Sequence, residues 1–454
     1  MLRRTVLVLL LGLTLISLAW YVREATPAGT GLAAKQLCSL TFVSRLQAER
    51  AIRLYVRPLI GPLAPFLRTD IDPVTRRVRT DVFGMAPAIA VNHPGYGCIQ
   101  LHEKTAGQLD QIFPVREYAT PVTWGRNIAH RQASFDSTSL SMTMDNALAI
   151  PGTMAVVVTQ AGELVAERYA RGVDGDTPLP GWSMGKTVTA VLAGMLARRG
   201  LLRADEVALF ESWENDDRVH ISMDNLLRMT SGIDIIENKT GADANSAMLF
   251  KTGDAGGYAE ARGLRRRPGE RFDYTSGSTM LAARVITQRL GGPAPTLSFI
   301  RRELFQPLQM RSTRFEPDEN GQFIGSSFIM ASAHDWARFG QLLLRRGEVN
   351  GERYVDETWI DYMTTPTPQA TRRPYGAGVW LVDPASDRNT WMHGLPADAY
   401  YASGLQTNQL WIIPGHELVI VRLGATSDFF ESGVIELVKG VVAAHLNSAT
   451  EVST

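Results

Sequence analysis

The stretch with the clearest chemical potential is 181–186, which reads GWSMGK. It places Ser183 three residues before Lys186, and positions i and i+3 lie on one face of a helix. The apolar segment 187–196 follows directly and has the pattern of a buried helix. A lysine desolvated at the positively charged start of a helix has a lowered pKa, so its neutral amine can accept the proton of a serine. We therefore predict that Ser183 is a nucleophile and Lys186 its general base.

The same stretch also satisfies G-x-S-x-G, the nucleophile elbow of α/β-hydrolases. An elbow needs a buried strand directly before the serine, and segment 174–180 (DGDTPLP) is too polar and too rich in proline for a central strand. The elbow would also need a histidine, and His334, His393 and His416 are available. The lysine-based interpretation is favoured, because the chain has only six lysines and one of them stands at this position.

A second motif follows about 90 residues later, where Tyr274 and Ser276 form Y-x-S. It comes after a loop sequence, PGERF at 268–272, and before the apolar segment 280–290. A tyrosine at the start of a helix can carry a proton between a serine, a lysine and a leaving group. We predict that Tyr274 is the third catalytic residue and that Ser276 lines the substrate site.

S-x-x-K followed by Y-x-S in this context resembles the class C β-lactamase-like family, which includes D-Ala-D-Ala peptidases, family VIII esterases and 6-aminohexanoate-dimer hydrolases. Segment 225–232 (NLLRMTSG) is similar to the family's L-L-x-M-T-S-G sequence. Three further segments resemble the nylon-oligomer hydrolase branch in particular: 305–308 (FQPL), 333–340 (AHDWARFG) and 394–399 (GLPADA). The resemblance covers about 140 to 447. It implies an α+β, β-lactamase/transpeptidase-like fold, with an antiparallel sheet flanked by helices and an inserted helical domain.

The family's third motif, K-T-G in true β-lactamases, lies on the strand that lines the site. Its best match here is ASG at 402–404, just before the last hairpin. The resemblance implies that the backbone N–H groups of Ser183 and Leu405 form an oxyanion hole, because two aimed donors stabilise a tetrahedral oxyanion.

The resemblance also implies that Ser403 and Gly404 contact the substrate, with Gly404 allowing a close approach of the strand. An alternative third motif uses His393, since some relatives have H-x-G there. His393 is therefore kept as a substrate-binding candidate.

Three departures from the family pattern bear on the substrate. The third motif has no lysine to bind the carboxylate of a β-lactam, and Y-x-S replaces the Y-x-N of class C enzymes. Segment 233–240 lacks the tyrosine that nylon-oligomer enzymes carry after T-S-G. We therefore expect a serine hydrolase that cleaves a carboxylic ester or a short amide. A D-amino-acid peptidase, a β-lactamase-type amidase and a non-catalytic cell-wall peptide-binding protein remain alternatives.

Composition limits the partners of this 454-residue chain, which is long enough for more than one domain. Its 46 basic and 46 acidic residues balance, so it has no electrostatic reason to bind nucleic acid. The sequence contains neither C-x-x-C nor H-E-x-x-H, and we expect no metal and no cofactor. The expected partner is a small-molecule substrate, and the sequence does not indicate an oligomeric state.

The N-terminus carries an export signal. Arg3 and Arg4 precede an uncharged apolar run at 5–21, which suits a signal peptide or a single membrane anchor within 1–24. Either one places the rest of the chain in the periplasm, or on the inner membrane facing the periplasm. In an exported protein the two cysteines, Cys38 and Cys98, are expected to form a disulfide.

Composition and periodicity divide the rest of the chain into segments. We predict a linker, an accessory domain, a hydrolase domain and a disordered tail at 25–36, 37–125, 126–447 and 448–454. Two predicted hairpins and a final helix occupy 153–169, 409–423 and 433–446. This order predicts one antiparallel sheet built from both ends of the hydrolase domain, with a helical domain inserted between them.

Overall fold

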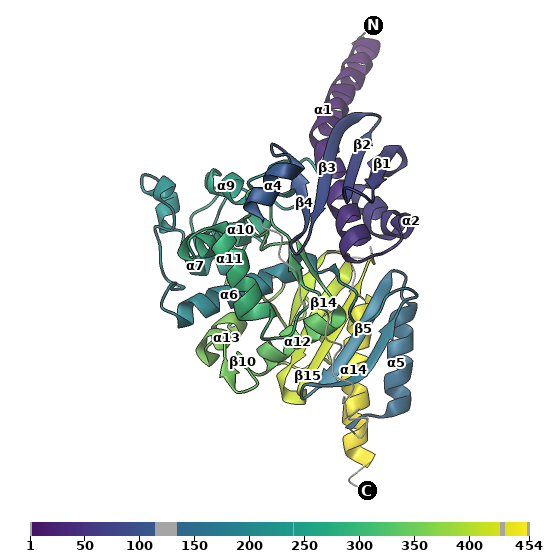
Figure 1. Cartoon of the computed structure of the whole chain (residues 1–454), viewed down its shortest axis with the longest axis vertical. Coiled ribbons are helices and arrows are strands. Elements are labelled where there is room, and N and C mark those ends of the chain that lie inside the picture. The colour runs from purple at the N-terminus through teal and green to yellow at the C-terminus, as the bar shows by residue number, and fades with distance from the viewer. Residues whose placement is uncertain (1, 114–133, 239, 427–431, 452–454) are drawn as a thin grey trace.

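The computed structural model describes residues 2–113, 134–238, 240–426 and 432–451. A six-stranded antiparallel sheet forms the centre of the C-terminal part, in the order β12-β13-β14-β15-β5-β6 (Figure 1). The pairing of β15 with β5, with Val421 opposite Val157, joins the two ends of the predicted hydrolase domain. The prediction of one sheet from both ends is confirmed. The strands are Thr153–Gln160 (β5), Glu163–Tyr169 (β6), Trp380–Leu381 (β12), Tyr400–Gly404 (β13), Asn408–Ile413 (β14) and Leu418–Gly424 (β15).

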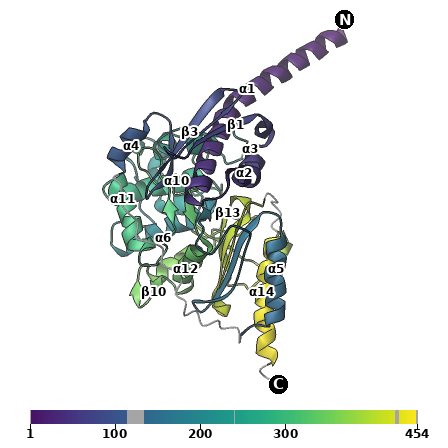
Figure 2. The same ribbon diagram turned by 45° about the vertical axis from the view of Figure 1, so that its right-hand side comes forward.

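Helices cover both faces of this sheet. Helices α5 (Ser137–Ala149) and α14 (Ser432–Glu451) lie side by side on one face, and α12 (Ala333–Leu344) packs on the other (Figure 2). Every residue of β5 is buried, because the strand lies inside the sheet and has a helical layer on each side. Its sequence is accordingly a continuous run of small and β-branched residues rather than an alternating one.

The inserted helical region lies between β6 and β12. Its central element is α6 (Gly185–Arg198), in which all residues from Gly185 to Leu196 are buried. A small sheet of order β7-β9-β8 and a hairpin of β10 with β11 accompany it. The other helices of the insert are Met223–Leu227 (α7), Ala244–Phe250 (α8), Ala255–Glu260 (α9), Ser276–Arg289 (α10), Pro293–Phe299 (α11) and Glu357–Thr364 (α13). The short strands are Leu179–Pro180 (β7), Arg314–Phe315 (β8), Ile329–Ala331 (β9), Glu348–Val349 (β10) and Glu352–Arg353 (β11).

The N-terminus is one continuous helix, α1 (Leu2–Cys38). The prediction of a linker at 25–36 is wrong, because this segment is helical and mostly buried against the accessory sheet. Its small residues permit close packing instead of flexibility: a Cβ on Gly31 would lie 2.5 Å from the carbonyl oxygen of Phe250. Among the residues that the structure describes, no helix combines the length and the apolar character that a membrane crossing requires.

The accessory unit is a four-stranded antiparallel meander packed on α1. The expected disulfide forms between Cys38 and Cys98 and ties the end of α1 to β4. Disulfides are typical of proteins outside the reducing cytoplasm, and the periplasmic location stays a prediction. The predicted boundary at 125/126 lies outside the described residues. The elements are Ala48–Ala51 (α2), Arg57–Ile60 (α3), Leu67–Asp72 (β1), Arg77–Val82 (β2), Met85–His93 (β3), Gly97–Leu101 (β4) and Ala106–Ile112 (α4).

Two carboxylates of the hydrolase part hold the accessory unit. Glu316 forms a buried ion pair with Lys35 of α1 and accepts the backbone N–H of Cys98 at 2.6 Å. Glu319 accepts the three successive backbone N–H groups of 102–104, just after β4. The accessory unit and the hydrolase part are therefore joined by buried polar contacts.

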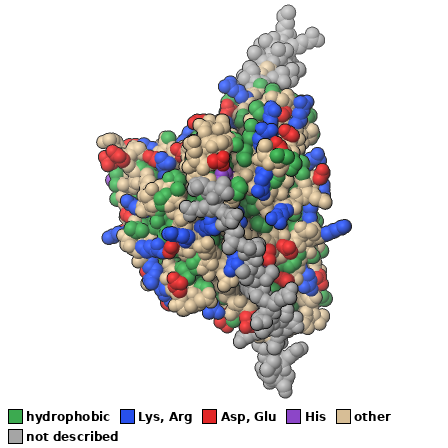
Figure 3. Space-filling view, in the orientation of Figure 1, with side chains coloured by type: hydrophobic (Ala, Val, Ile, Leu, Met, Phe, Trp, Pro, Cys, Tyr) green, Lys and Arg blue, Asp and Glu red, His purple; other side chains and the backbone are tan. Residues whose placement is uncertain are grey.

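The surface charge agrees with the sequence prediction, whereas the C-terminal tail differs from it. Acidic and basic side chains are interspersed over the face in Figure 3, as the balanced composition suggests. The disordered tail at 448–454 is wrong for 448–451, because α14 continues to Glu451. That stretch contains no glycine or proline to end the helix. Residues 452–454 lie outside the described part of the chain.

Candidate active site

Ser183 lies at the entrance to α6, within the 3₁₀ turn Trp182–Met184. The residue before it, Trp182, has a φ of +49°, a left-handed conformation that is costly for a large side chain and typical of strained functional turns. The preceding strand β7 has only two residues and lies at the edge of the small sheet. This is not the central strand of a nucleophile elbow. The Ser183 side chain is half-buried and so keeps access to solvent.

Lys186 lies one turn further on and is almost completely buried, at 2% exposure. Its Nζ is 3.0 Å from Ser183 Oγ, 3.0 Å from Ser276 Oγ and 3.2 Å from the carbonyl oxygen of Ser326. The i, i+3 spacing read from the sequence therefore does bring amine and hydroxyl together. Three oxygens surround one nitrogen, which suits an amine that exchanges a proton with one of them.

Tyr274 completes this cluster. Its phenol interacts with the Ser183 side chain, which acts to lower the pKa of the phenol, and Lys186 Nζ lies 4.9 Å from the centre of its ring. Trp380 of β12 stacks on the ring at 5.3 Å. Burial, followed by the charge of Glu237, raises the pKa of Tyr274, whereas the Ser183 hydrogen bond and Arg373 act in the opposite direction. The phenol therefore holds its proton at neutral pH and can donate it.

Ser276 is the first residue of α10 and links Lys186 to a carboxylate. Its Oγ and its backbone N lie 2.9 Å and 2.8 Å from Glu237 Oε2. Glu237 was not identified from the sequence. It lies in segment 233–240, five residues after Gly232 of the T-S-G sequence, where relatives carry a tyrosine. Its polar side chain in this segment is the one feature of the sequence that points to Glu237.

The third motif lies at the end of β13, beside the nucleophile. A Cβ on Gly404 would lie 2.1 Å from the carbonyl oxygen of Gly181, so only glycine permits this approach of the two backbones. Gly404 therefore lets β13 pack closely against the segment that carries Ser183. Ser403 and Leu405 flank Gly404 and are half-buried. Leu405 starts a tight turn, Leu405–Thr407, directly after β13, the strand that contacts the turn of Ser183.

His393 lies elsewhere, in the connection between β12 and β13. Its side chain is exposed, and its Nε2 is 3.2 Å from the carbonyl oxygen of Ser386. None of the contacts found among the described residues joins His393 to Ser183, Lys186 or Tyr274. The approach of 402–404 to the nucleophile segment supports this stretch over His393 as the third motif.

Arg373 is a cation outside the three motifs whose charge acts on Tyr274. This residue donates hydrogen bonds from Nε and Nη2 to the Tyr401 hydroxyl at 2.8 and 2.5 Å, and its guanidinium lies 4.5 Å from the ring of Trp380. It is one of the charges that act on the pKa of Tyr274. No spacing in the sequence points to Arg373, because this residue lies in a loop outside the three motifs.

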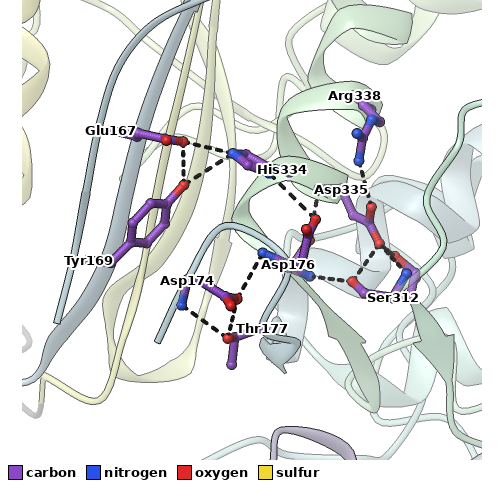
Figure 4. A network of polar contacts seen from close by, with 11 residues as sticks. Glu167, Tyr169, Asp174, Asp176, Thr177, Ser312, His334, Asp335 and Arg338 are labelled. Carbon is purple, nitrogen blue, oxygen red and sulfur yellow. Dashed lines mark hydrogen bonds and ion pairs between the residues drawn. The ribbon is translucent and has the colours of Figure 1, made fainter. Parts of the chain in front are cut away.

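His334 belongs to a separate network, shown in Figure 4. Its Nε2 lies 2.8 Å from Glu167 and 3.1 Å from the Tyr169 hydroxyl, and its Nδ1 lies 3.5 Å from Asp176. A Cβ on Gly175 would meet the imidazole at 2.1 Å, so His334 packs tightly against the loop that leads to the nucleophile. His334 supports this loop from α12 and is not placed beside Ser183.

The third histidine of the elbow interpretation, His416, faces His445, with 3.3 Å between their Nδ1 atoms. Within the described part of the chain, the groups found in contact with Ser183 Oγ are thus an amine and a phenol. This arrangement supports the lysine-based interpretation over the elbow.

Comparisons with known proteins agree with this geometry. The solved structures that resemble the chain include a protein assigned as a 6-aminohexanoate-dimer hydrolase from Bacillus anthracis, with 20% identity, a TM-score of 0.53, and coverage of 69% of this chain and 80% of that one. A class C beta-lactamase has 16% identity and a TM-score of 0.54, covering 70% and 98%. A penicillin-binding protein homolog from Caulobacter crescentus has 15% identity and a TM-score of 0.53, covering 72% and 100%.

At these identities the likenesses show the fold alone, which is of the β-lactamase/transpeptidase type, as the motifs implied. No curated protein matches the chain. The Beta-lactamase family model matches residues 140–435, which is more than half of the sequence. The chain therefore belongs to the beta-lactamase family.

Proposed function

We propose that the chain is a serine hydrolase that cleaves a carboxylic ester or a short amide through an acyl-enzyme on Ser183. Proteins of this family are generally serine hydrolases. The observation that carries the proposal is the buried amine of Lys186, 3.0 Å from Ser183 Oγ. The phenol of Tyr274 interacts with the same serine.

In the proposed acylation, Ser183 Oγ attacks the carbonyl carbon while its proton passes to Lys186. The carbonyl oxygen becomes an oxyanion, held by the backbone N–H groups of Ser183 and Leu405. Tyr274 then donates its proton to the leaving alcohol or amine and regains one from Lys186. The carbonyl–leaving-group bond breaks, and the acyl group remains on Ser183.

In the proposed deacylation, water attacks the acyl carbon and gives its proton to the Lys186–Tyr274 pair. Ser183 recovers a proton as the acid leaves, which restores the starting state. General-base catalysis and a pair of oxyanion donors are each typically worth about a hundredfold or more in rate.

The substrate class follows from the third motif. Ser403 and Gly404 provide a hydroxyl and a backbone, not an ammonium, beside the nucleophile. This arrangement suits a neutral carbonyl compound, which supports an ester or a short amide over a β-lactam carboxylate. A substrate panel should therefore include short-chain p-nitrophenyl esters, D-amino-acid amides, linear amide oligomers and a chromogenic cephalosporin.

The test uses Ser183→Ala and Lys186→Met beside the unaltered protein. Ser183→Ala should abolish ester turnover and labelling by a fluorophosphonate, and Lys186→Met should lower kcat/KM about a hundredfold or more. A fold check by circular dichroism accompanies both. If the unaltered protein stays unlabelled, the alternative of a non-catalytic peptide-binding protein is favoured; if Ser183→Ala keeps most of its activity, the nucleophile is wrong.

A further inference from the structure

Glu237 is a carboxylate outside the three motifs that contacts Ser276, a neighbour of Lys186. It stands in the loop after Gly232, and this loop packs on the start of α10: a Cβ on Gly277 would lie 2.6 Å from Ile235. One oxygen of Glu237, Oε2, receives both the backbone N–H and the Oγ–H of Ser276, at 2.8 and 2.9 Å. The first contact caps the helix, whereas the second reaches into the proposed active site.

The second contact fixes the direction of the Ser276 hydroxyl. A hydroxyl has a single proton to donate, and an ionised carboxylate can only accept. Because Ser276 donates its proton to Glu237, its oxygen can only accept from Lys186, 3.0 Å away. The carboxylate thus makes Ser276 an obligate acceptor toward the lysine.

The same argument applies to the other side of the amine. The carbonyl oxygen of Ser326, 3.2 Å from Lys186 Nζ, is also an acceptor only. A neutral amine has two N–H bonds and one lone pair. When Ser276 and Ser326 accept the two N–H bonds, the lone pair is left for the third neighbour, Ser183 Oγ at 3.0 Å.

We propose that Glu237 is a positioning residue: by holding Ser276 as an acceptor, it turns the lone pair of neutral Lys186 toward the hydroxyl of Ser183. This inference rests on the proposed function, in which Lys186 is the base. Without Glu237, the Ser276 hydroxyl is free to donate its own proton to the lysine lone pair, and the amine then presents N–H instead of a lone pair to Ser183.

The negative charge of Glu237 has a second, separable effect. It favours the ammonium form of the nearby Lys186 and the neutral form of Tyr274, since a negative charge stabilises a cation and opposes a second anion. Among the described residues, Arg373 also acts on Tyr274, in the opposite direction, and Tyr375 has a pKa that is raised by burial, by Tyr274 and by Glu237. Removing the charge should therefore move the rising part of the pH profile of kcat/KM to lower pH.

Two substitutions separate position from charge. In Glu237→Gln, the amide oxygen can replace Oε2 and accept both Ser276 bonds, so kcat should stay within about threefold while the ascending limb of kcat/KM moves to lower pH. In Glu237→Ala both the acceptor and the charge are lost. We expect kcat to fall about tenfold or more, with a smaller change in KM.

Asp136 offers a matched control. It caps α5 in the outer layer of the hydrolase domain and, like Glu237, accepts the backbone N–H and the Oγ–H of one serine, Ser139, at 3.3 and 2.6 Å. Asp136→Ala should lower the melting temperature, because the cap of α5 is lost. It should leave kcat and the pH profile unchanged.

The rate of fluorophosphonate labelling at Ser183 is measured for every variant, because it reports activation of the nucleophile whatever the natural substrate is. The inference predicts fast labelling for the unaltered protein and Glu237→Gln, and labelling slowed about tenfold for Glu237→Ala. Ser276→Ala should be slowed similarly, and the double variant no further, since the two residues act in one chain.

Three results would overturn the inference. One is a Glu237→Ala variant that loses stability like Asp136→Ala but labels at the unaltered rate, which would make Glu237 a helix cap only. Another is a Glu237→Gln variant as slow as Glu237→Ala. The third is full additivity of Glu237→Ala and Ser276→Ala. Failure of the unaltered protein to label at all would instead reject the proposed function, so the two failures are distinguishable.

Discussion

The guanidinium of Arg422 on β15 donates a hydrogen bond to the carbonyl oxygen of Gln406, 3.1 Å away, inside the turn that begins with Leu405. Gln406 and Thr407 both have left-handed backbones, with φ of +62° and +56°. Arg422 also donates to the carbonyl oxygen and the hydroxyl of Thr407 and is 1% exposed. A buried cation therefore holds the strained turn that carries the proposed second oxyanion donor.

Arg422→Met should destabilise the protein by about 3 kcal/mol, because it leaves the buried carbonyl oxygens of the turn without donors. Activity should fall as well, about tenfold, as the turn relaxes and the N–H of Leu405 moves. Urea unfolding and ester kinetics measure the two effects. Arg168 on the edge strand β6 is the control: Arg168→Met removes an exposed ion pair with Asp145 and should cost less than about 1 kcal/mol. Equal losses for the two variants would contradict this role.

Glu316→Gln should destabilise the protein by roughly 3–5 kcal/mol, since it leaves the ammonium of Lys35 buried without its counter-charge. Burial already lowers the pKa of Lys35, and Glu316 opposes this shift. The double variant Lys35→Met/Glu316→Gln removes both charges and should recover part of the loss. Chemical unfolding followed by tryptophan fluorescence checks the prediction, and a double variant as unstable as the sum of the two single ones would contradict it.

The pH dependence of stability should carry a contribution from Asp318. Burial, followed by the charge of Asp254, raises its pKa to about 8. In the unfolded chain an aspartate ionises near pH 4, so between about pH 4 and 8 the folded state binds the extra proton. The contribution of Asp318 to stability is then complete below about pH 4 and is lost as the pH rises toward 8.

Asp318→Asn removes this titration. The free energy of unfolding, measured at pH 5 and pH 7.5, should fall less with rising pH in the variant than in the unaltered protein. Parallel pH profiles for the two proteins would show that Asp318 does not hold a proton in the folded state.

The sequence determined the parts of this protein that depend on near neighbours. The spacing of Ser183 and Lys186 fixes their meeting, because three residues make about one helical turn. The hairpin of β5 with β6 follows from a β-branched run that turns at Gly162. The Y-x-S pattern added Tyr274 and the resemblance added the third motif, and the fold brings both to the segment of Ser183.

The prediction of a linker failed because it was based on composition alone, without knowledge of packing. The small residues at 25–36 have the composition of a linker, yet they form the buried half of α1, because alanine and glycine let a helix approach its neighbours closely. Whether such a segment is flexible or tightly packed depends on a partner surface that comes much later in the chain.

Only the tertiary structure decided which groups control the amine of Lys186. Its acceptor Ser326 is 140 residues away, and Glu237 reaches Ser276 across 39 residues. No periodicity encodes such separations, because they follow from how the helical insert folds back on α6. The sequence thus determined which residues could react, and the packing of distant loops decided how a lone pair and a proton are directed between them.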